Sequence, residues 1–279
     1  MPTGINATMK KEIYMKLLII GPNGKMGKAI VQTAYKNKDI TIVGGIAPSN
    51  RSYINSDLGY LCGIGTPINA LVYDNINDII SKADLVVDCT MPDVSISVLK
   101  VCVEHNKAFI TGTTGFNASE MEYIKESAEC IPLLLAANTS KLTHIFYAQL
   151  INVCKSIKEY ADIDIIDYHD NMKLDAPSGT AKEIARMIAK ELNYDVNTCF
   201  EYGRNARKRR GKNTIAFNSI RSGGISGAIK VIFGFQDENI ELSLNIFNMN
   251  TFAKGIVDGC LYLKNKGNGL YGIEEVFKI

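Results

Sequence analysis

At 279 residues the chain is long enough to bury a sizeable core and to form one or two domains. A hydrophobic content of 46% and a charged content of 22% are ordinary for a globular protein, and no apolar run reaches the roughly eighteen residues of a membrane-spanning helix. The net charge of +2 argues against a nucleic-acid-binding protein. We therefore expect a protein that binds neither nucleic acid nor membrane.

The seven cysteines and the N-terminal region indicate in which cellular compartment the protein works. No two cysteines form a Cys-x-x-Cys pair and their number is odd, so we expect reduced thiols rather than a disulfide framework or structural zinc. The first fifteen residues lack the apolar stretch of a signal peptide, and residues 1–14 read as a polar lead-in. We expect a cytoplasmic protein without a metal site.

The first half of the chain alternates short apolar runs with amphipathic stretches. Strands alternating with helices predict a parallel sheet that is covered on both faces, as in a Rossmann-type α/β domain. We place this domain at residues 1–140. The expected strands are 16–20, 40–46, 83–89, 108–111 and 132–136, and the expected helices are 25–36, 94–104 and 119–130.

The second half has a different pattern, in which consecutive extended runs are separated by turn residues. This pattern predicts a smaller α+β domain with a mixed or antiparallel sheet, at residues 141–249. The last helix, at about 251–265, would return to the first domain, so that residues 250–279 complete it. The other expected elements are helices at 141–160 and 176–192, the latter with Pro177 in its first turn, and strands at 163–168, 214–220, 228–235 and 240–246.

A glycine-rich loop follows the first strand and opens the first helix. Gly21 would permit the tight turn, Gly24 would let the backbone approach a pyrophosphate, and Gly27 would let helix and strand pack closely. The helix N-terminus then offers free N–H groups to the phosphate. An ordinary structural turn is the alternative, but the strand–loop–helix order favours dinucleotide binding. The loop also contains Asn23, Lys25 and Met26.

The end of the second strand bears on the choice between NADH and NADPH. The carboxylate that usually bonds the ribose hydroxyls is missing, and Ser49, Asn50 and Arg51 follow the strand instead. Cationic and hydroxyl groups, Lys25 among them, suit the 2′-phosphate of NADPH. We expect either NADPH or NADH to serve as cofactor, with NADPH preferred.

The most informative segment is Asp167–Ala181. It places His169 and Lys173 after an apolar strand and Ser178-Gly179-Thr180 at the start of a helix. Such a helix start presents hydroxyl and N–H groups that suit a carboxylate, and a histidine or lysine can donate a proton near neutral pH. A capped helix with exposed polar residues explains the same residues equally well.

The segment Lys173–Ala181, Lys-x-Asp-Ala-Pro-Ser-Gly-Thr-Ala, resembles the substrate-domain signature of the 4-hydroxy-tetrahydrodipicolinate reductase (dihydrodipicolinate reductase) family. The resemblance continues in order along nearly the whole chain after Leu17. The other matching blocks are Gly24-Lys-Met-Gly27, Asp88-Cys-Thr-Met-Pro92, Gly112-Thr-Thr-Gly115, Ala137-Asn-Thr-Ser140, Arg221-Ser-Gly-Gly-Ile-Ser-Gly227 and Gly269-Leu-Tyr271.

The resemblance implies an NADH- or NADPH-dependent reductase of a cyclic dicarboxylate imine in lysine biosynthesis, usually a homotetramer joined through substrate-domain sheets. His169 and Lys173 would be the acid and proton-transfer residues. The substrate would lie at Asp170, Ser178, Gly179 and Thr180. Gly112, Thr114 and Asn138 would line the nicotinamide site, with Lys25 near the adenosine phosphate.

Several positions depart from the family pattern, among them Ala137 and Thr139, where the family has proline and phenylalanine. Asp170 replaces a second histidine, Ala228 follows Gly227 where the family has Glu-His, and Met249 replaces an arginine. A carboxylate at Asp170 would repel a dicarboxylate unless it pairs with a cation or turns away. Two alternatives remain open: a divergent relative that reduces another carboxylated imine or ketone, and a nucleotide-binding sensor without catalysis.

Three further features are assigned simpler roles. The basic run 204–212 is expected to be a solvated loop rather than a phosphate site. His105 is expected at the surface, and His144 is expected to cap a helix or lie at a hinge rather than act in catalysis.

Overall fold

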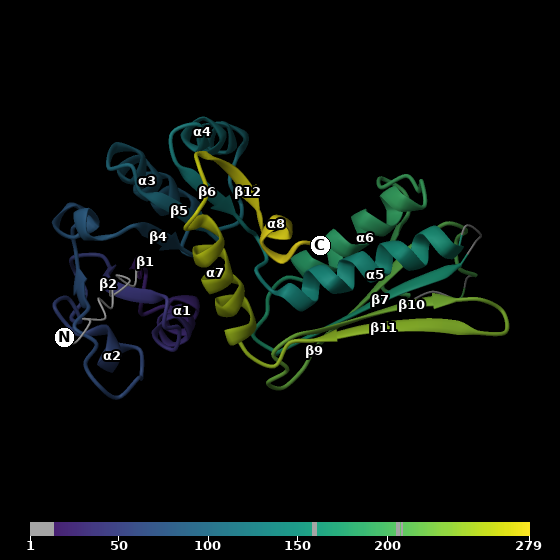
Figure 1. Cartoon of the computed structure of the whole chain (residues 1–279). Helices are drawn as coiled ribbons and strands as arrows, with labels where there is room; N and C mark the ends of the chain where they lie inside the picture. The colour runs from purple at the N-terminus through teal and green to yellow at the C-terminus, as the bar shows by residue number, and fades with distance from the viewer. Residues whose placement is uncertain (1–13, 158–160, 205–206, 208) are drawn as a thin grey trace, which may run out of the picture. The chain divides into compact units, whose positions relative to one another are not determined.

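The computed structural model describes residues 14–157, 161–204, 207 and 209–279. The chain divides into two compact units (Figure 1). Unit 1 comprises the residues up to Thr139 together with Phe252–Val276, and unit 2 comprises Ser140–Thr251 with Phe277–Ile279. Each unit contains its own sheet.

Unit 1 is built on a seven-stranded sheet in which every neighbouring pair is parallel. The β1 to β6 part follows the strand order of a Rossmann fold, and β12 extends it at one edge. In spatial order the strands are β12 (Gly269–Gly272), β6 (Pro132–Leu135), β5 (Ala108–Thr111), β4 (Leu85–Asp88), β1 (Met15–Ile20), β2 (Ile40–Ile46) and β3 (Leu71–Tyr73).

The central strands of this sheet are buried on both faces. All four residues of β4 are buried, which is why the strand reads as a continuous apolar run rather than an alternating one. Helix α1 buries Ile30, Val31 and Ala34 along one stripe. The longer helices of unit 1 are α1 (Lys25–Tyr35), α3 (Pro92–Glu104), α4 (Ala118–Ala128) and most of α7 (Asn250–Leu263).

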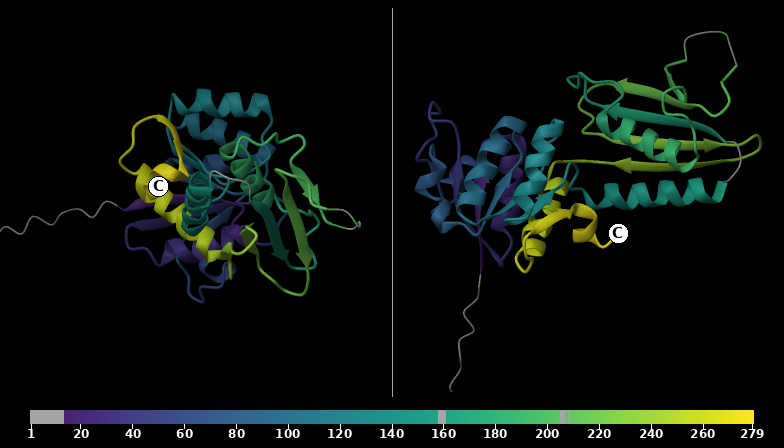
Figure 2. Two further views of the ribbon diagram at one scale, coloured as in Figure 1. Left: turned by 90° about the vertical axis from the view of Figure 1, so that its right-hand side faces the viewer. Right: turned by 90° about the horizontal axis from the view of Figure 1, so that it is seen from above.

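Unit 2 is a five-stranded mixed sheet with two helices on one face (Figures 1 and 2). Strand β10 is antiparallel to both neighbours, whereas β7, β9 and β8 run parallel. In spatial order the strands are β11 (Asn239–Asn245), β10 (Ala228–Gly234), β7 (Asp162–His169), β9 (Ile215–Arg221) and β8 (Phe200–Tyr202), and the helices are α5 (Lys141–Ile157) and α6 (Gly179–Glu191).

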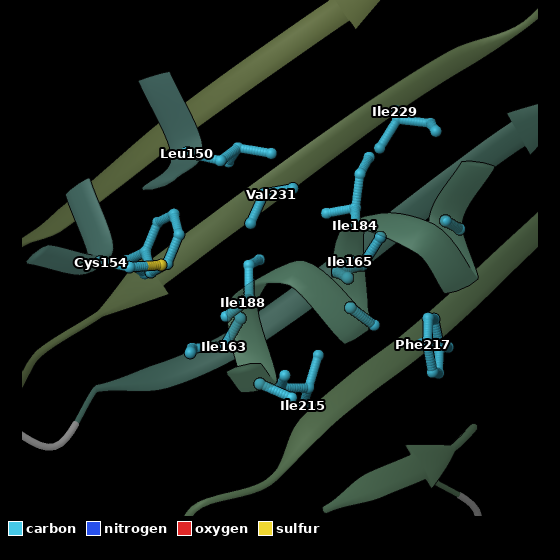
Figure 3. Packing of buried hydrophobic residues seen from close by; sticks show 14 of the residues in the cluster. Leu150, Cys154, Ile163, Ile165, Ile184, Ile188, Ile215, Phe217, Ile229 and Val231 are labelled. Carbon is cyan, nitrogen blue, oxygen red and sulfur yellow. The ribbon is translucent and has the colours of Figure 1, made fainter. Parts of the chain in front are cut away.

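The core of unit 2 lies between this sheet and its helices (Figure 3). Along β10, Ile229, Val231 and Phe233 are buried while the residues between them are partly exposed. This alternation shows that helices cover only one face of the strand. Ile184 and Ile188 of α6 pack into the same cluster.

The predicted fold class is confirmed: a Rossmann-type parallel sheet accompanies a smaller unit with a mixed sheet. Most predicted boundaries agree with the structure to within one or two residues, and the start of α6 is wrong by three. Helix α6 begins at Gly179 with Ser178 as its N-cap, so Pro177 lies just before the helix. The short elements not anticipated are α2 (Leu58–Leu61), β3, β8, β12, α8 (Ile273–Phe277) and the 3-10 turns η1 (Ile76–Asp78) and η2 (Ile80–Lys82).

Parts of three expected segments lie outside the described residues: 1–13 of the lead-in, 158–160 of the helix expected at 141–160, and three positions of the basic run. All seven cysteines are free thiols. Over the part of the chain that the structure describes, no helix is long and apolar enough to cross a membrane.

Candidate active site

The glycine loop of unit 1 has the backbone geometry that close packing requires. Gly21 has φ +66°, and a Cβ added at Gly27 would lie only 2.2 Å from the carbonyl oxygen of Gly21. Any side chain at residue 27 would therefore force helix α1 away from β1. Gly24 is the N-cap of α1, and no side chain caps this helix start. Its N–H groups are thus available to a phosphate.

The loop after β2 contributes cationic and polar groups at the same end of the sheet, where the carboxyl ends of the strands lie. Strands β1 and β2 are parallel neighbours, so the loops that follow Ile20 and Ile46 leave the sheet on the same side. Arg51 is exposed on the loop after β2, Lys25 is exposed as the first residue of α1, and Asn23 in the loop after β1 is half-buried. Residues 47–52 contain no carboxylate.

A buried aspartate organises the carboxyl ends of β4 and β5. Asp88 is fully buried, and its two carboxylate oxygens accept hydrogen bonds from the hydroxyls of Thr90 (2.6 Å) and Thr113 (2.9 Å). The Thr113 hydroxyl also accepts a bond from the Thr90 N–H at 3.1 Å. This network anchors the loop in which Gly112 and the exposed Thr114 lie.

In unit 2, Asp167 and His169 lie at the carboxyl end of β7. Asp167 is also fully buried, and its Oδ2 accepts hydrogen bonds from the Ser178 N–H and from Arg221 Nη2, each at 2.8 Å. Its Oδ1 lies 2.8 Å from Nδ1 of His169. Sequence reasoning assigned no role to Asp167 or Arg221, although both fall within the quoted motifs.

The Ser178 turn is a capped helix start, as the sequence indicates. The Ser178 hydroxyl accepts a hydrogen bond from the Ala181 N–H at 3.2 Å. Ser178 is buried, whereas Gly179 is exposed and Thr180 is half-buried. The positive end of the α6 dipole is therefore open to an anion.

Lys173 and Asp175 form an ion pair beside this helix start. The Lys173 ammonium lies 2.7 Å from the Asp175 carboxylate. The hydrogen bond from Lys173 is the main cause that lowers the pKa of Asp175, and the N–H of Gly179 adds to it. The carboxylate of Asp175 thus contacts the groups that the sequence assigns to a substrate carboxylate.

Asp170 is engaged within its own turn. Its Oδ1 accepts a hydrogen bond from the Met172 N–H at 2.8 Å, and its carbonyl oxygen accepts one from the Lys173 N–H at 3.3 Å. The backbone thereby fixes the position of one carboxylate oxygen.

The electrostatic surroundings of His169 favour the neutral imidazole. Burial is the largest influence and lowers its pKa, while Asp167 acts in the opposite direction. Lys173 and Arg221 add to the lowering, which indicates that both cations lie near the ring. His169, Lys173, Asp170 and the Ser178 turn are thus gathered in unit 2.

The remaining polar features have structural surroundings. Arg210 of the basic run pairs with Asp162 and Asp164, so the expectation of a solvated loop is wrong at this position. His105 is exposed, as expected. His144 lies within α5 and packs near Tyr147, so it does not cap the helix. Within the described residues, no group of three or more His, Cys, Asp and Glu side chains could hold a metal ion.

Asn138 lies half-buried in the loop between β6 and α5. Its neighbour Thr139 donates a hydrogen bond from its hydroxyl to the carbonyl oxygen of Phe252 at 2.8 Å. The segment containing Asn138 is therefore tied to α7 within unit 1.

Comparison with known proteins places both halves of the chain in one family. The model of the dihydrodipicolinate reductase N-terminus matches residues 15–139, and that of its C-terminus matches residues 143–277. The curated 4-hydroxy-tetrahydrodipicolinate reductase of Buchnera aphidicola subsp. Schizaphis graminum (strain Sg) is 33% identical over 272 residues, which cover 97% of this chain and 99% of that protein.

Solved structures show the same fold. The dipicolinate-bound dihydrodipicolinate reductase from Paenisporosarcina sp. TG-14 matches with a TM-score of 0.71 and 22% identity, covering 94% of this chain and 98% of that chain. An amine dehydrogenase from Mycobacterium smegmatis matches with a TM-score of 0.65 and 12% identity, covering 93% and 95%. The resemblance drawn from the sequence motifs is confirmed: this chain belongs to the dihydrodipicolinate reductase family.

Proposed function

We propose that the protein is an NAD(P)H-dependent oxidoreductase that reduces 4-hydroxy-tetrahydrodipicolinate, a cyclic dicarboxylate imine, in lysine and diaminopimelate biosynthesis. Membership of the family over nearly the whole chain supports the reaction. The observation that carries the proposal is local. His169 and the capped helix start at Ser178, which suits a carboxylate, both contact Asp167. Lys173 pairs with Asp175 in the loop just before that helix.

Unit 1 has the features of a dinucleotide site, and we infer that it is the cofactor domain. Gly27 lets the start of α1 pack closely against the loop after β1, and the uncapped start of α1 leaves N–H groups for a pyrophosphate. Gly112, Thr114 and Asn138 are the proposed nicotinamide contacts. The proposed phosphate and adenosine contacts are Gly21, Asn23, Gly24, Lys25, Met26, Gly27 and Arg51.

We infer that the protein prefers NADPH to NADH. The loop after β2 offers Arg51 and no carboxylate, and Lys25 is exposed at the start of α1. A guanidinium can bind a 2′-phosphate, whereas NADH lacks that group. The ratio of kcat/KM for the two cofactors measures the preference. Arg51→Ala should reduce kcat/KM for NADPH and leave that for NADH unchanged; a wild-type preference for NADH contradicts the inference.

Unit 2 is the proposed substrate domain. Ser178, Gly179 and Thr180 would hold one substrate carboxylate, with Lys173 as a fixed cation. Bound nicotinamide supplies the hydride, so the part left to the protein is position and charge. Reduction of a conjugated imine builds negative charge on nitrogen or the adjacent carbon. His169 and Lys173 are the groups that would deliver the compensating proton.

A direct assay separates the candidate functions. Substrate generated by the preceding aldolase reaction is added to the protein with NADPH, and loss of the reduced nicotinamide is followed by absorbance. We expect fast turnover. Slow turnover would favour a divergent relative acting on another carboxylated imine or ketone, for which Asp170, Ala228 and Met249 are the motivating departures. Cofactor binding without turnover would indicate a sensor.

We also propose a cytoplasmic homotetramer joined through the sheets of unit 2. On the sheet face opposite α5 and α6, Ile166 and Ile232 are only partly buried and Ile220 is 40% exposed. Apolar side chains on an uncovered sheet face suit an interface between copies. Light scattering coupled to gel filtration should give the mass of a tetramer, and Ile220→Asp should lower that mass.

A further inference from the structure

We propose that Asp167 is a positioning residue that orients the His169 imidazole for proton transfer and ties it to the Ser178 turn. This inference rests on the proposed function, because it gives Asp167 a task in that reaction. The carboxylate holds both parts of the site from one buried point in unit 2. Asp167 therefore acts through His169 and does not touch the substrate.

The first arm of this arrangement is the contact with the imidazole. Asp167 Oδ1 and His169 Nδ1 lie 2.8 Å apart. Both atoms are buried and have no hydrogen-bond partner of standard geometry among the described residues, so this close approach is the polar contact left to each of them. A carboxylate can only accept, so a hydrogen bond across this contact requires the proton on Nδ1. The neutral ring then has its free lone pair on Nε2.

The second arm holds the helix start. Asp167 Oδ2 accepts the Ser178 N–H at 2.8 Å, and Ser178 in turn caps α6 through its hydroxyl. The imidazole and the anion-binding turn are therefore held by opposite oxygens of a single carboxylate. A change in the position of this carboxylate would move both groups.

Arg221 makes the buried charge tolerable. Its Nη2 donates to Asp167 Oδ2 at 2.8 Å, and its Nη1 donates to the Asp167 carbonyl oxygen at 3.1 Å. The same guanidinium donates to the carbonyl oxygen of Asp175 at 2.6 Å. A fully buried carboxylate would be costly without such a cation.

The orientation of the ring leaves Nε2 available. Nε2 lies 3.4 Å from the point that a Cβ at Gly227 would occupy, so the glycine keeps this side of the ring uncrowded. Among the described residues, none forms a hydrogen bond with Nε2 of His169. A proton taken up by the neutral ring would therefore go to Nε2, and Asp167 would stabilise the imidazolium that forms.

The charged groups around the imidazole ring determine how replacing Asp167 should change the pKa of His169. Asp167 on β7 favours the protonated ring, while Lys173 from the following loop and Arg221 on β9 oppose it. Replacing Asp167 by asparagine would remove the favourable charge and leave both cations. The pKa of His169 should then fall further below its ordinary value.

Histidine NMR tests the proposal without reference to turnover. The chain has only three histidines, so their ring signals are readily assigned by substitution. In the wild-type protein, ¹⁵N shifts should show the Nδ1–H tautomer for His169. Detection of the Nε2–H tautomer would overturn the proposal even if no variant folds.

The variants extend the test to catalysis. Asp167→Asn should lower the His169 pKa, move the alkaline limb of the kcat profile to lower pH, and reduce kcat by about 10- to 100-fold, as for other groups that orient a histidine. Asp167→Glu should restore the limb. Asp164→Asn is the matched control, because Asp164 lies on the same strand and pairs with Arg210. It should leave the His169 titration unchanged.

The two proposals fail in different ways. A wild-type protein that does not oxidise NADPH with the substrate would remove the proposed function, whatever the tautomer. An Asp167→Asn protein with the wild-type His169 pKa and pH profile would overturn the positioning role while leaving the reaction in place.

Discussion

Two buried aspartates lie at or near the carboxyl ends of central strands in the two sheets, and their partners differ in kind. Asp88 in unit 1 is bonded by the hydroxyls of Thr90 and Thr113. Asp167 in unit 2 is bonded by Arg221 and lies against His169. Asp88 anchors the loop that contains Gly112, and Asp167 anchors the Ser178 turn. Only Asp167 is linked to groups that carry charge.

This difference separates a mechanical role from a chemical one. Threonine hydroxyls do not titrate near neutral pH, so the partners of Asp88 carry no charge that depends on pH. The network of Asp167 includes an imidazole, whose charge depends on the carboxylate and on nearby cations. We therefore expect pH-dependent chemistry to be confined to unit 2.

The largest expected effect comes from removing the proposed proton-transfer residues. His169→Ala and Lys173→Ala should each lower kcat by about 10²- to 10⁴-fold, because general acid catalysis typically contributes that much. Circular dichroism should show the fold retained. Lys190→Ala, an exposed lysine at the end of α6, is the control. Near-normal turnover in both variants would rule out these roles.

Removing Asp88 should weaken unit 1 and leave the chemistry of unit 2 unchanged. Asp88→Ala leaves the buried hydroxyl of Thr113 and the part-buried hydroxyl of Thr90 without their acceptor, at a cost of about 1–3 kcal/mol in the free energy of unfolding. Denaturant titration measures this cost, and the Kd for NADPH should rise. The His169 titration should not change. A shift in the His169 titration would show that the Asp88 network and the Asp167 network are coupled.

Acid should destabilise the protein before the carboxylates protonate. Burial is the main cause that lowers the pKa of His169 below 6.5, so near that pH the unfolded chain binds a proton that the native protein does not. The free energy of unfolding should therefore be fully retained above about pH 6.5 and should fall as the pH drops below it. Asp167, whose pKa is lowered from 3.8, contributes a further loss only in stronger acid.

His169→Gln provides the comparison for this pH dependence. The variant should show a flatter stability profile between about pH 5 and 7, because the group responsible is gone. An unchanged profile would mean that His169 has the same pKa in the native and the unfolded protein, contrary to the lowering expected from its burial.

The smallest expected effect is at Asp175. Its carboxylate pairs with Lys173 at 2.7 Å and competes for the groups assigned to the substrate. The pair is partly exposed and worth at most about 1 kcal/mol, so Asp175→Asn should lower the substrate KM by roughly two- to five-fold. Steady-state kinetics with varied substrate measures this change. A higher KM would show instead that Asp175 holds Lys173 in place for the substrate.

Much of unit 1 could be predicted from the sequence. The strands expected at 40–46 and 108–111 coincide with β2 and β5, and the helix expected at 25–36 with α1 to within one residue. Buried parallel strands and amphipathic helices leave clear periodic patterns. The three-residue strands β3 and β8 are too short to show a pattern, and they form because neighbouring strands pair with them.

The start of α6 was predicted three residues too early. Apolar spacing continues back to Ala176, but the side chain of Ser178 bonds the Ala181 N–H and so marks the true N-cap. Capping depends on side-chain geometry that spacing does not reveal. The same limit applies to Arg210, whose partners lie on β7 and whose role in the basic run could not be inferred locally.

The sequence by itself determined the family, the order of elements and the residue types of the proposed site, because glycine turns, apolar periodicity and the Lys173–Ala181 motif are local properties. Only the tertiary structure decided which groups partner one another. Asp167 meets Arg221 because β7 and β9 are parallel neighbours in a register that sets His169 opposite Arg221. The tertiary structure also decided that the Asp170 carboxylate accepts a hydrogen bond from the Met172 N–H in the same turn. Contacts between residues far apart in the chain depend on strand pairing, which no local pattern specifies.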